Sequence, residues 1–155
     1  MSGFLYTGVG AGMSYEEKGT WVYLVVAVTG SAVYLSLVLP QLLGGVPVDE
    51  IDYVPAMLWI IGAAIVASIV LRILVEIVVP SGNTRGDVRD REIDRLGERV
   101  GGAFVVIGAL VALVLALFEG GYFWIANVIY LCFVLSAILS SVTKLIAYRR
   151  GVPSW

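Results

Sequence analysis

Long apolar runs separated by short polar breaks dominate the chain. Four of these runs reach about 20 residues, the length that a helix needs to cross roughly 30 Å of hydrocarbon. They span approximately residues 20–43, 54–79, 100–118 and 122–147. Because lipid offers no hydrogen-bond partner to bare backbone groups, and because the runs are too long for barrel strands, this pattern predicts helices. The expected fold is therefore an all-α integral membrane four-helix bundle.

The four expected helices divide into two halves that resemble each other. A charged pair precedes the first and third runs, at residues 17–18 and 98–99, and a Trp-Ile step stands near the start of the second and fourth, at residues 59–60 and 124–125. Two tandem helical hairpins of the same orientation would give this similarity. Independently evolved hydrophobic hairpins explain it equally well, so both interpretations stay open.

The segments outside the runs are short. Residues 1–18 are expected to form a flexible cytoplasmic segment, residues 19–150 the transmembrane domain, and residues 151–155 a C-terminal tail. The first 12 residues are small, glycine-rich and uncharged, and they lack the basic start of a secretory signal. Met13 is therefore an alternative start of the natural chain.

The charges are sorted by sign between the two sides of the expected bundle. All ten Lys and Arg residues fall on one side if the chain starts inside the cell: Lys18, Arg72, Arg85, Arg89, Arg91, Arg95, Arg99, Lys144, Arg149 and Arg150. The loops on the other side carry acidic residues: Asp49, Glu50, Asp52 and Glu119. Positive charge favours the cytoplasmic side, so we expect both termini in the cytoplasm of a prokaryotic cell, with the bundle in its plasma (inner) membrane.

Composition agrees with this assignment and excludes several functions. The chain is 59% apolar and 14% charged, whereas a soluble domain is about 45–50% apolar and about 25% charged. A net charge of -2 disfavours nucleic acid as a partner. One cysteine and no histidine exclude an intrachain disulfide, the usual zinc sites and His-based triads. We expect no catalytic residues, no cofactor and no metal.

A highly charged segment at residues 85–100 precedes the third run. Its five arginines and five acidic residues balance, and their spacing predicts a cytoplasmic helix with an acidic ridge beside a basic one. The two ridges are the expected partner-binding surface: Asp90, Asp94 and Glu98, and Arg91, Arg95 and Arg99. Complementary charge sets orientation and specificity in such contacts. The alternative is a solvated extension of the third helix.

A short motif at the mouth of the third run carries a family resemblance. Asp87, Arg89 and Ile93 resemble the D-E-R-x-x-x-I signature of small prokaryotic four-helix membrane proteins of unknown function, with Val88 in place of the glutamate. The resemblance implies a multi-pass membrane protein and brings no established catalytic residues with it.

Arg72 and Glu76 form the expected intramembrane polar pair. Ionisable groups within a span are costly and are functional candidates for that reason. The two residues stand four apart on one helix face, about 12 Å from Pro80 for Arg72 at about 1.5 Å per residue. An arginine there can extend to the cytoplasmic head groups. Alternatively, the pair can face the bundle, where it would form an inner gate or bind a lipid head group through a contact of Arg72 with the phosphate.

No carboxylate lies at the expected bilayer midplane, which argues against a proton-coupled exporter. Tyr34 and Tyr130 are aromatic residues in the middle of their spans. We expect each to bridge two helices; the alternative is that they line a cavity. The leading hypothesis is a non-catalytic accessory or regulatory subunit that acts through its charged segment. The alternative is a small homo-oligomeric channel or transporter. The expected partners are membrane lipids and a homo-oligomer or larger membrane complex.

Overall fold

The computed structural model describes residues 14–80 and 88–151, and within them it is helical almost throughout. The helices are α1 (Tyr15–Leu43), η1 (Val48–Glu50), α2 (Tyr53–Val78), α3 (Val88–Leu117) and α4 (Tyr122–Arg150). The predicted all-α fold class is confirmed, and all four α-helices are long and apolar enough to cross a membrane. Met13, Arg85, Asp87 of the signature and tail residues 152–155 lie outside the described residues.

The ends of the helices follow from local chemistry. The side chain of Ser14 accepts a hydrogen bond from the backbone N–H of Glu17 at 3.1 Å and so caps α1. Arg149 and Arg150 occupy the last turn of α4, where their positive charge interacts favourably with the negative end of the helix dipole. The turn between α3 and α4 is short, and Gly121 takes a φ of 85° there, in the left-handed region that glycine adopts without strain.

From residue 88 onward, the charged segment and the third run form one continuous helix. The sequence places the charged residues at 85–100 and the span at 100–118, whereas α3 runs from Val88 to Leu117 without a break. Gly101 and Gly102 do not interrupt it, because Gly101 is buried against α4. Residues 88–100 of the charged segment therefore continue directly into a membrane-spanning helix.

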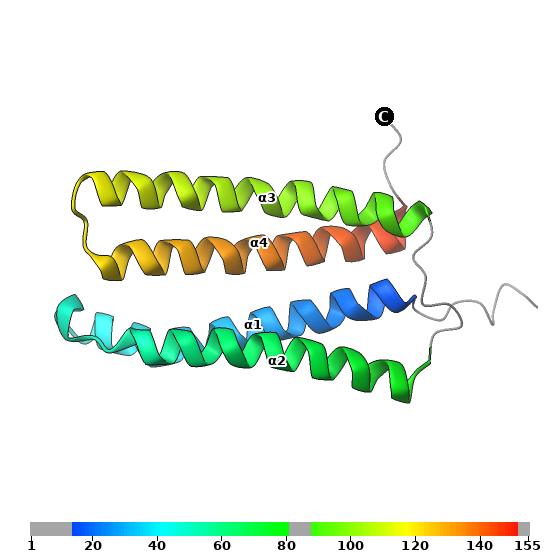
Figure 1. Ribbon diagram of the computed structural model, residues 1–155, viewed down its shortest axis with the longest axis horizontal. Coiled ribbons are helices and arrows are strands. Elements are labelled where there is room, and N and C mark those ends of the chain that lie inside the picture. The colour runs from blue at the N-terminus through cyan, green and yellow to red at the C-terminus, as the bar shows by residue number, and fades with distance from the viewer. Residues whose placement is uncertain (1–13, 81–87, 152–155) are drawn as a thin grey trace, which may run out of the picture.

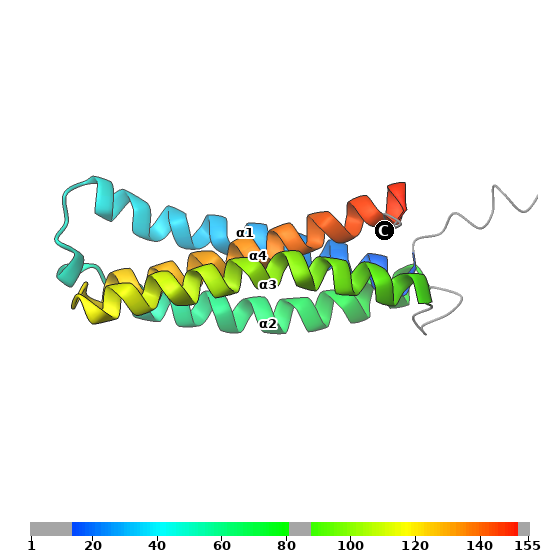
Figure 2. The same cartoon turned by 90° about the horizontal axis from the view of Figure 1, so that it is seen from above.

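Two antiparallel helical hairpins lie side by side (Figure 1). One consists of α1 and α2 and the other of α3 and α4, and the hairpins meet where α1 packs on α4. In the view of Figure 1, α2 and α3 lie on the outer flanks with α1 and α4 between them, and α2 and α3 are not among the helix pairs that pack extensively on each other. Figure 2 shows the same four helices from above. None of the described residues of α2 is buried, so its large apolar surface is available to lipid.

The tightest contact in the bundle lies between α3 and α4. Gly97, Gly101 and Gly108 are buried on one face of α3. A Cβ atom added to Gly101 would stand 2.9 Å from Oγ of Ser136, and one added to Gly108 would stand 2.8 Å from Sγ of Cys132. Small residues of this kind let two membrane helices approach closely enough for van der Waals packing to hold them together.

This contact predicts that Gly108→Ala destabilises the protein. The new methyl group would overlap Cys132, and overpacking should outweigh the better helix propensity of alanine by about 1 kcal/mol. The control is Gly102→Ala on the same helix, because no atom lies within 4 Å of its added Cβ. Thermal unfolding in detergent, followed by circular dichroism, should show a lower Tm for the first variant only. Equal Tm values for the two variants would contradict the close packing.

Candidate functional site

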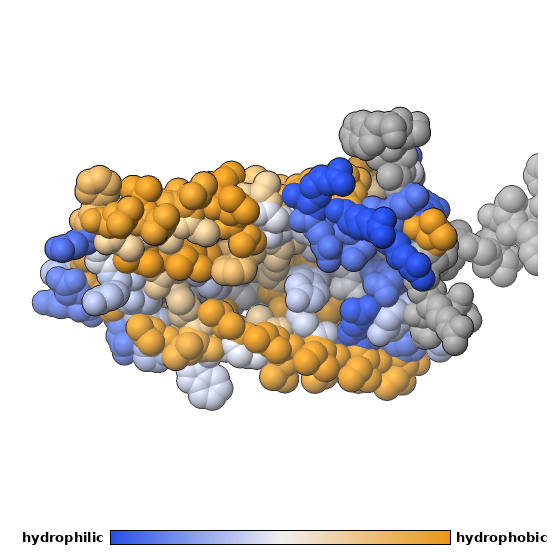
Figure 3. Space-filling view, turned by 45° about the horizontal axis from the view of Figure 1, so that its top comes forward, coloured by the Kyte–Doolittle hydropathy of each residue, from blue (hydrophilic) through white to orange (hydrophobic). Residues whose placement is uncertain are grey.

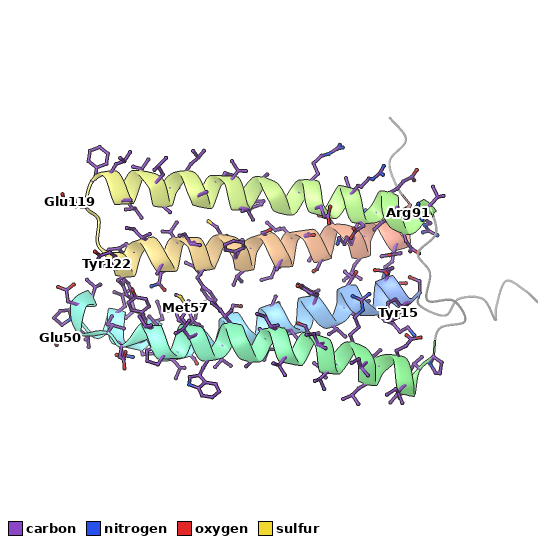
Figure 4. All side chains as sticks on the ribbon, viewed as in Figure 1. Tyr15, Glu50, Met57, Arg91, Glu119 and Tyr122 are labelled. Atoms are coloured by element: carbon purple, nitrogen blue, oxygen red, sulfur yellow. The ribbon has the colours of Figure 1, made fainter. Side chains whose placement is uncertain are left out.

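The basic residues gather at one end of the bundle. The helices place all nine Lys and Arg residues in the described part of the chain at the end where α1 and α3 begin. We call this the cationic end. Glu50 and Glu119 lie at the opposite end, together with Tyr122, whereas Arg91 and Tyr15 mark the cationic end (Figure 4). The charge sorting seen in the sequence is thus present in the structure.

A polar cleft of about 590 Å³ opens at the cationic end between the two hairpins. Its walls come from α1, α3 and α4, with Arg72 from α2. Seven charged side chains line it: Glu16, Arg72, Asp90, Arg91, Asp94, Glu98 and Lys144. Ser136, Ser140 and Ser141 add hydroxyl groups from α4. The cleft therefore offers donors, acceptors and both signs of charge to a ligand.

The acidic ridge of α3 is engaged by α4. Nζ of Lys144 lies 2.5 Å from Oδ1 of Asp94, and the hydroxyl of Tyr148 donates a hydrogen bond to Oδ1 of Asp90 at 3.0 Å. Arg89 donates to the backbone carbonyl of Tyr148 at 2.8 Å. Asp90 and Asp94, which the sequence assigns to a partner surface, therefore bind within the chain and fasten the charged segment to α4.

The other ridge residues divide between two surfaces. Arg91 and Glu98 are exposed and line the cleft. Arg95 and Arg99 are exposed as well, but they do not line it. Because of the helical period, Glu92, Arg95 and Arg99 form one stripe, which we call the outer face of α3. Figure 3 shows this end of the molecule as its most hydrophilic region, beside apolar surfaces on α2 and on the far half of α3.

Arg72 and Glu76 share a face of α2, and each has a partner on α1. Nη2 of Arg72 lies 3.5 Å from Oε2 of Glu16, and its guanidinium carbon lies 4.5 Å from the centre of the Tyr15 ring. Oε2 of Glu76 lies 3.0 Å from Nζ of Lys18. The two side chains therefore join α2 to α1. The sequence groups Arg72 with Glu76, whereas in the structure each residue has its ionic partner on α1. Arg72 also reaches the cleft.

Lys18 is the residue that the sequence interpretation missed. Its side chain is only 7% exposed, and it both pairs with Glu76 and donates a hydrogen bond to the backbone carbonyl of Val79. The second contact satisfies a carbonyl at the end of α2, where no intrahelical donor remains. The neighbouring Gly19 leaves room for Arg72, since an added Cβ would stand 2.9 Å from the guanidinium carbon. The signal in the sequence that could have identified Lys18 is a Lys-Gly pair on the first helix, at the same end of the bundle as the Arg-x-x-x-Glu spacing on the second.

An aromatic cluster closes the bundle at the acidic end. Tyr34 is 1% exposed, donates a hydrogen bond to Oδ1 of Asn127 at 2.5 Å, and lies 4.6 Å from the ring of Tyr130. Nδ2 of Asn127 in turn donates to the carbonyl of Phe123. The expectation that tyrosines bridge two helices is confirmed for Tyr34, which links α1 to α4. This cluster holds the hairpins together where the cleft is absent.

An apolar groove of about 600 Å³ extends from beside the cluster toward the cleft. It is lined by α1, α2 and α4, and Met57 points from α2 toward the space between the hairpins (Figure 4). Tyr23, Phe133 and Ala137 line both the groove and the polar cleft. The two cavities therefore adjoin each other, the cleft with a charged lining and the groove with an apolar one.

Comparison of the chain with protein-family models, with curated proteins and with solved structures gives no match. Among the described residues, no group of three His, Cys, Asp or Glu residues is placed to hold a metal ion. The cleft, the groove and the outer face of α3 are therefore the candidate functional surfaces.

The buried ion pair predicts a loss of stability on removal of one partner. Lys18→Met should lower the free energy of unfolding by about 2 kcal/mol, because Glu76 and the Val79 carbonyl lose a charged donor. The double variant Lys18→Met, Glu76→Leu should recover part of this loss, since no carboxylate is then left without its cation. Arg95→Met, at an exposed position, is the control and should leave the Tm in detergent unchanged. A single variant as stable as the control would refute the role of Lys18.

Proposed function

We propose that this multi-pass membrane protein is a non-catalytic accessory or regulatory subunit, and that it docks a protein through the outer face of α3. The supporting observation is the way in which α3 is held. Lys144 and Tyr148 engage its acidic ridge, so Arg95 and Arg99 project from a rigid helix. A rigid surface loses less conformational entropy when a partner binds. With two arginines and one glutamate, the outer face is suited to an acidic surface on the partner.

Charge reversal on the outer face tests this proposal. In the double variant Arg95→Glu, Arg99→Glu we expect the co-purifying partner to be lost, because both contacts become repulsive. Arg149→Glu, Arg150→Glu is the matched control, since it reverses two exposed arginines of the same end on α4. Mild extraction followed by identification of the associated proteins provides the measurement. Recovery of the same partner from both variants would exclude docking through this face.

We further propose that the cationic end faces the cytoplasm of a prokaryotic cell. The support is the separation of charge, with nine described cations at one end and acidic residues at the other, because positive loops are retained inside. The outer face of α3 then meets cytoplasmic proteins. The proposed similarity to the small four-helix membrane proteins with a D-E-R-x-x-x-I motif is compatible with this placement.

Cysteine labelling tests the orientation. In a Cys132→Ser background, a cysteine introduced by Asp49→Cys should react with a membrane-impermeant maleimide in intact cells, whereas one introduced by Arg95→Cys should react only after permeabilisation. Both positions are exposed in the structure, so reactivity reports the side of the membrane. Labelling of Arg95→Cys in intact cells would reverse the proposed topology.

A small homo-oligomeric channel or transporter is the second candidate function, and the polar cleft supports it. The cleft penetrates from the cationic end only, because Tyr34, Asn127 and Phe123 close the other end. Passage would require this cluster to open or a second copy to contribute a path. Solute flux into proteoliposomes that is lost in Arg72→Ala would favour this function over docking.

A further inference from the structure

Because the cleft and the groove adjoin each other, their combined lining is amphipathic. The cleft at the cationic end is lined by seven charged side chains, whereas Ser68 and the hydroxyl groups of Tyr23 and Tyr130 are the side-chain polar groups among the residues that line the groove. On α4 the groove extends from Ala126 to Ala137, about 16 Å at about 1.5 Å per residue. This is about half of the roughly 30 Å hydrocarbon core, the depth of one leaflet. The groove thus has the length of a single acyl chain.

The bilayer has direct access to this cavity. The hairpins associate through α1 and α4, whereas α2 and α3 do not pack extensively on each other. Figure 3 shows a hollow on the face between α2 and α3. A lipid can therefore enter sideways from the membrane without crossing a wall of packed side chains. A water-soluble ligand would gain nothing from the apolar half of the cavity.

The charges of the cleft select the head group. Arg72, Arg91 and Lys144 face four carboxylates across the cleft, so the lining has a formal charge of -1. An anionic lipid gains no net attraction from such a lining. A zwitterionic head group can place its phosphate near Arg72, whose pairing with Glu16 is long at 3.5 Å, and its ammonium near Glu98.

We infer that the cleft and the groove together bind one phospholipid with an aminoalkyl phosphate head group, such as phosphatidylethanolamine, whose head group lies at the cationic end. The head group occupies the polar cleft and one acyl chain fills the apolar groove. Each cavity, at about 590 and about 600 Å³, lies within the range of about 300–1,000 Å³ that is usual for ligand sites. The lipid then completes the contact between hairpins that meet along α1 and α4. This site is separate from partner docking at the outer face of α3.

Native mass spectrometry of the full chain tests the inference. The protein is reconstituted in vesicles of equal parts phosphatidylethanolamine and phosphatidylglycerol, extracted in mild detergent and analysed for bound lipid. We expect one retained phosphatidylethanolamine per chain, preferred over phosphatidylglycerol by about tenfold, or about 1.4 kcal/mol. Equal retention of the two lipids, or a preference for phosphatidylglycerol, would overturn the head-group assignment.

Two neighbouring alanines on α2 provide a matched pair of variants. Ala64 lines the groove and Ala63 is exposed without lining it. Ala64→Trp should lower lipid occupancy about tenfold, and Ala63→Trp should leave it unchanged. Ala64→Leu, a smaller change on the same face, should give an intermediate loss and keeps the test valid if the tryptophan variant fails to fold. Equal occupancy in the Ala63 and Ala64 variants would show that the lipid binds elsewhere.

Variants of Arg72 test the head-group contact without filling the groove. Arg72→Gln should remove the preference for phosphatidylethanolamine, and Arg72→Lys should restore part of it, because a cation remains but the bidentate geometry is lost. Saturation of the site by inorganic phosphate alone would contradict a lipid ligand. A second outcome would also contradict a lipid ligand: the wild-type protein forms a dimer, and Ala64→Trp abolishes the dimer without changing the amount of bound lipid. A second copy of the chain would then be the occupant of the groove. Partner co-purification is a separate readout, so failure of either proposal is recognised independently.

Discussion

The close approach of α3 and α4 is the constraint on which the rest of the structure depends. Gly97, Gly101 and Gly108 remove the side chains that would otherwise separate the two backbones, and in lipid, where no hydrophobic effect drives helices together, close packing has to supply the attraction. Gly97 has a second consequence, because the alkyl chain of Lys144 lies where a Cβ would stand. The lysine thereby reaches Asp94, which lies on α3 about one turn before Gly97. Packing and electrostatics in this hairpin are thus the result of the same glycines.

Charged groups within membrane-spanning helices are tolerated here because the helices of each hairpin pair them with one another. Lys18 and Glu76 form a pair that is largely removed from solvent, and such a pair costs desolvation that good geometry and further hydrogen bonds must offset. The carbonyl of Val79 supplies the additional acceptor. The pairs Arg72 with Glu16 and Lys144 with Asp94 are more exposed, and ion pairs of that kind contribute less to stability. Their main effect is geometric: they set the position of the helix ends that form the walls of the cleft.

The sequence was sufficient for the helices and insufficient for their contacts. Apolar length alone determines where a chain can cross lipid, so the four-helix fold and the sorting of charge followed from the pattern of residues. The partners of Arg72 and Glu76 did not, because a four-residue spacing brings two side chains to one face and leaves open what the next helix presents there. One contact could have been predicted from spacing. Asp90 and Asp94 are four residues apart on α3, and their partners Tyr148 and Lys144 are four residues apart in the reverse order on α4, as expected for an antiparallel pair of helices. The cleft depends on the association of α1 with α4, and no local pattern in the sequence specifies it.

The two ends of the bundle are built in opposite ways, and this asymmetry follows from the choice of side chains at the α1–α4 contact. Toward the acidic end, Tyr34 fills the contact and bonds to Asn127, so that ring packing and a hydrogen bond act at the same place. Toward the cationic end, the facing positions carry Gly19, Thr20 and the serines of α4, which are too small to fill the same space and leave polar groups along its wall. Large residues thus close the contact between the hairpins toward one end, whereas small and polar residues line an open cleft toward the other. Since a vacuum in the cleft would forfeit the contacts of every atom that lines it, the membrane or the solvent has to supply the molecule that fills it, and the polarity of the lining decides which molecule that is.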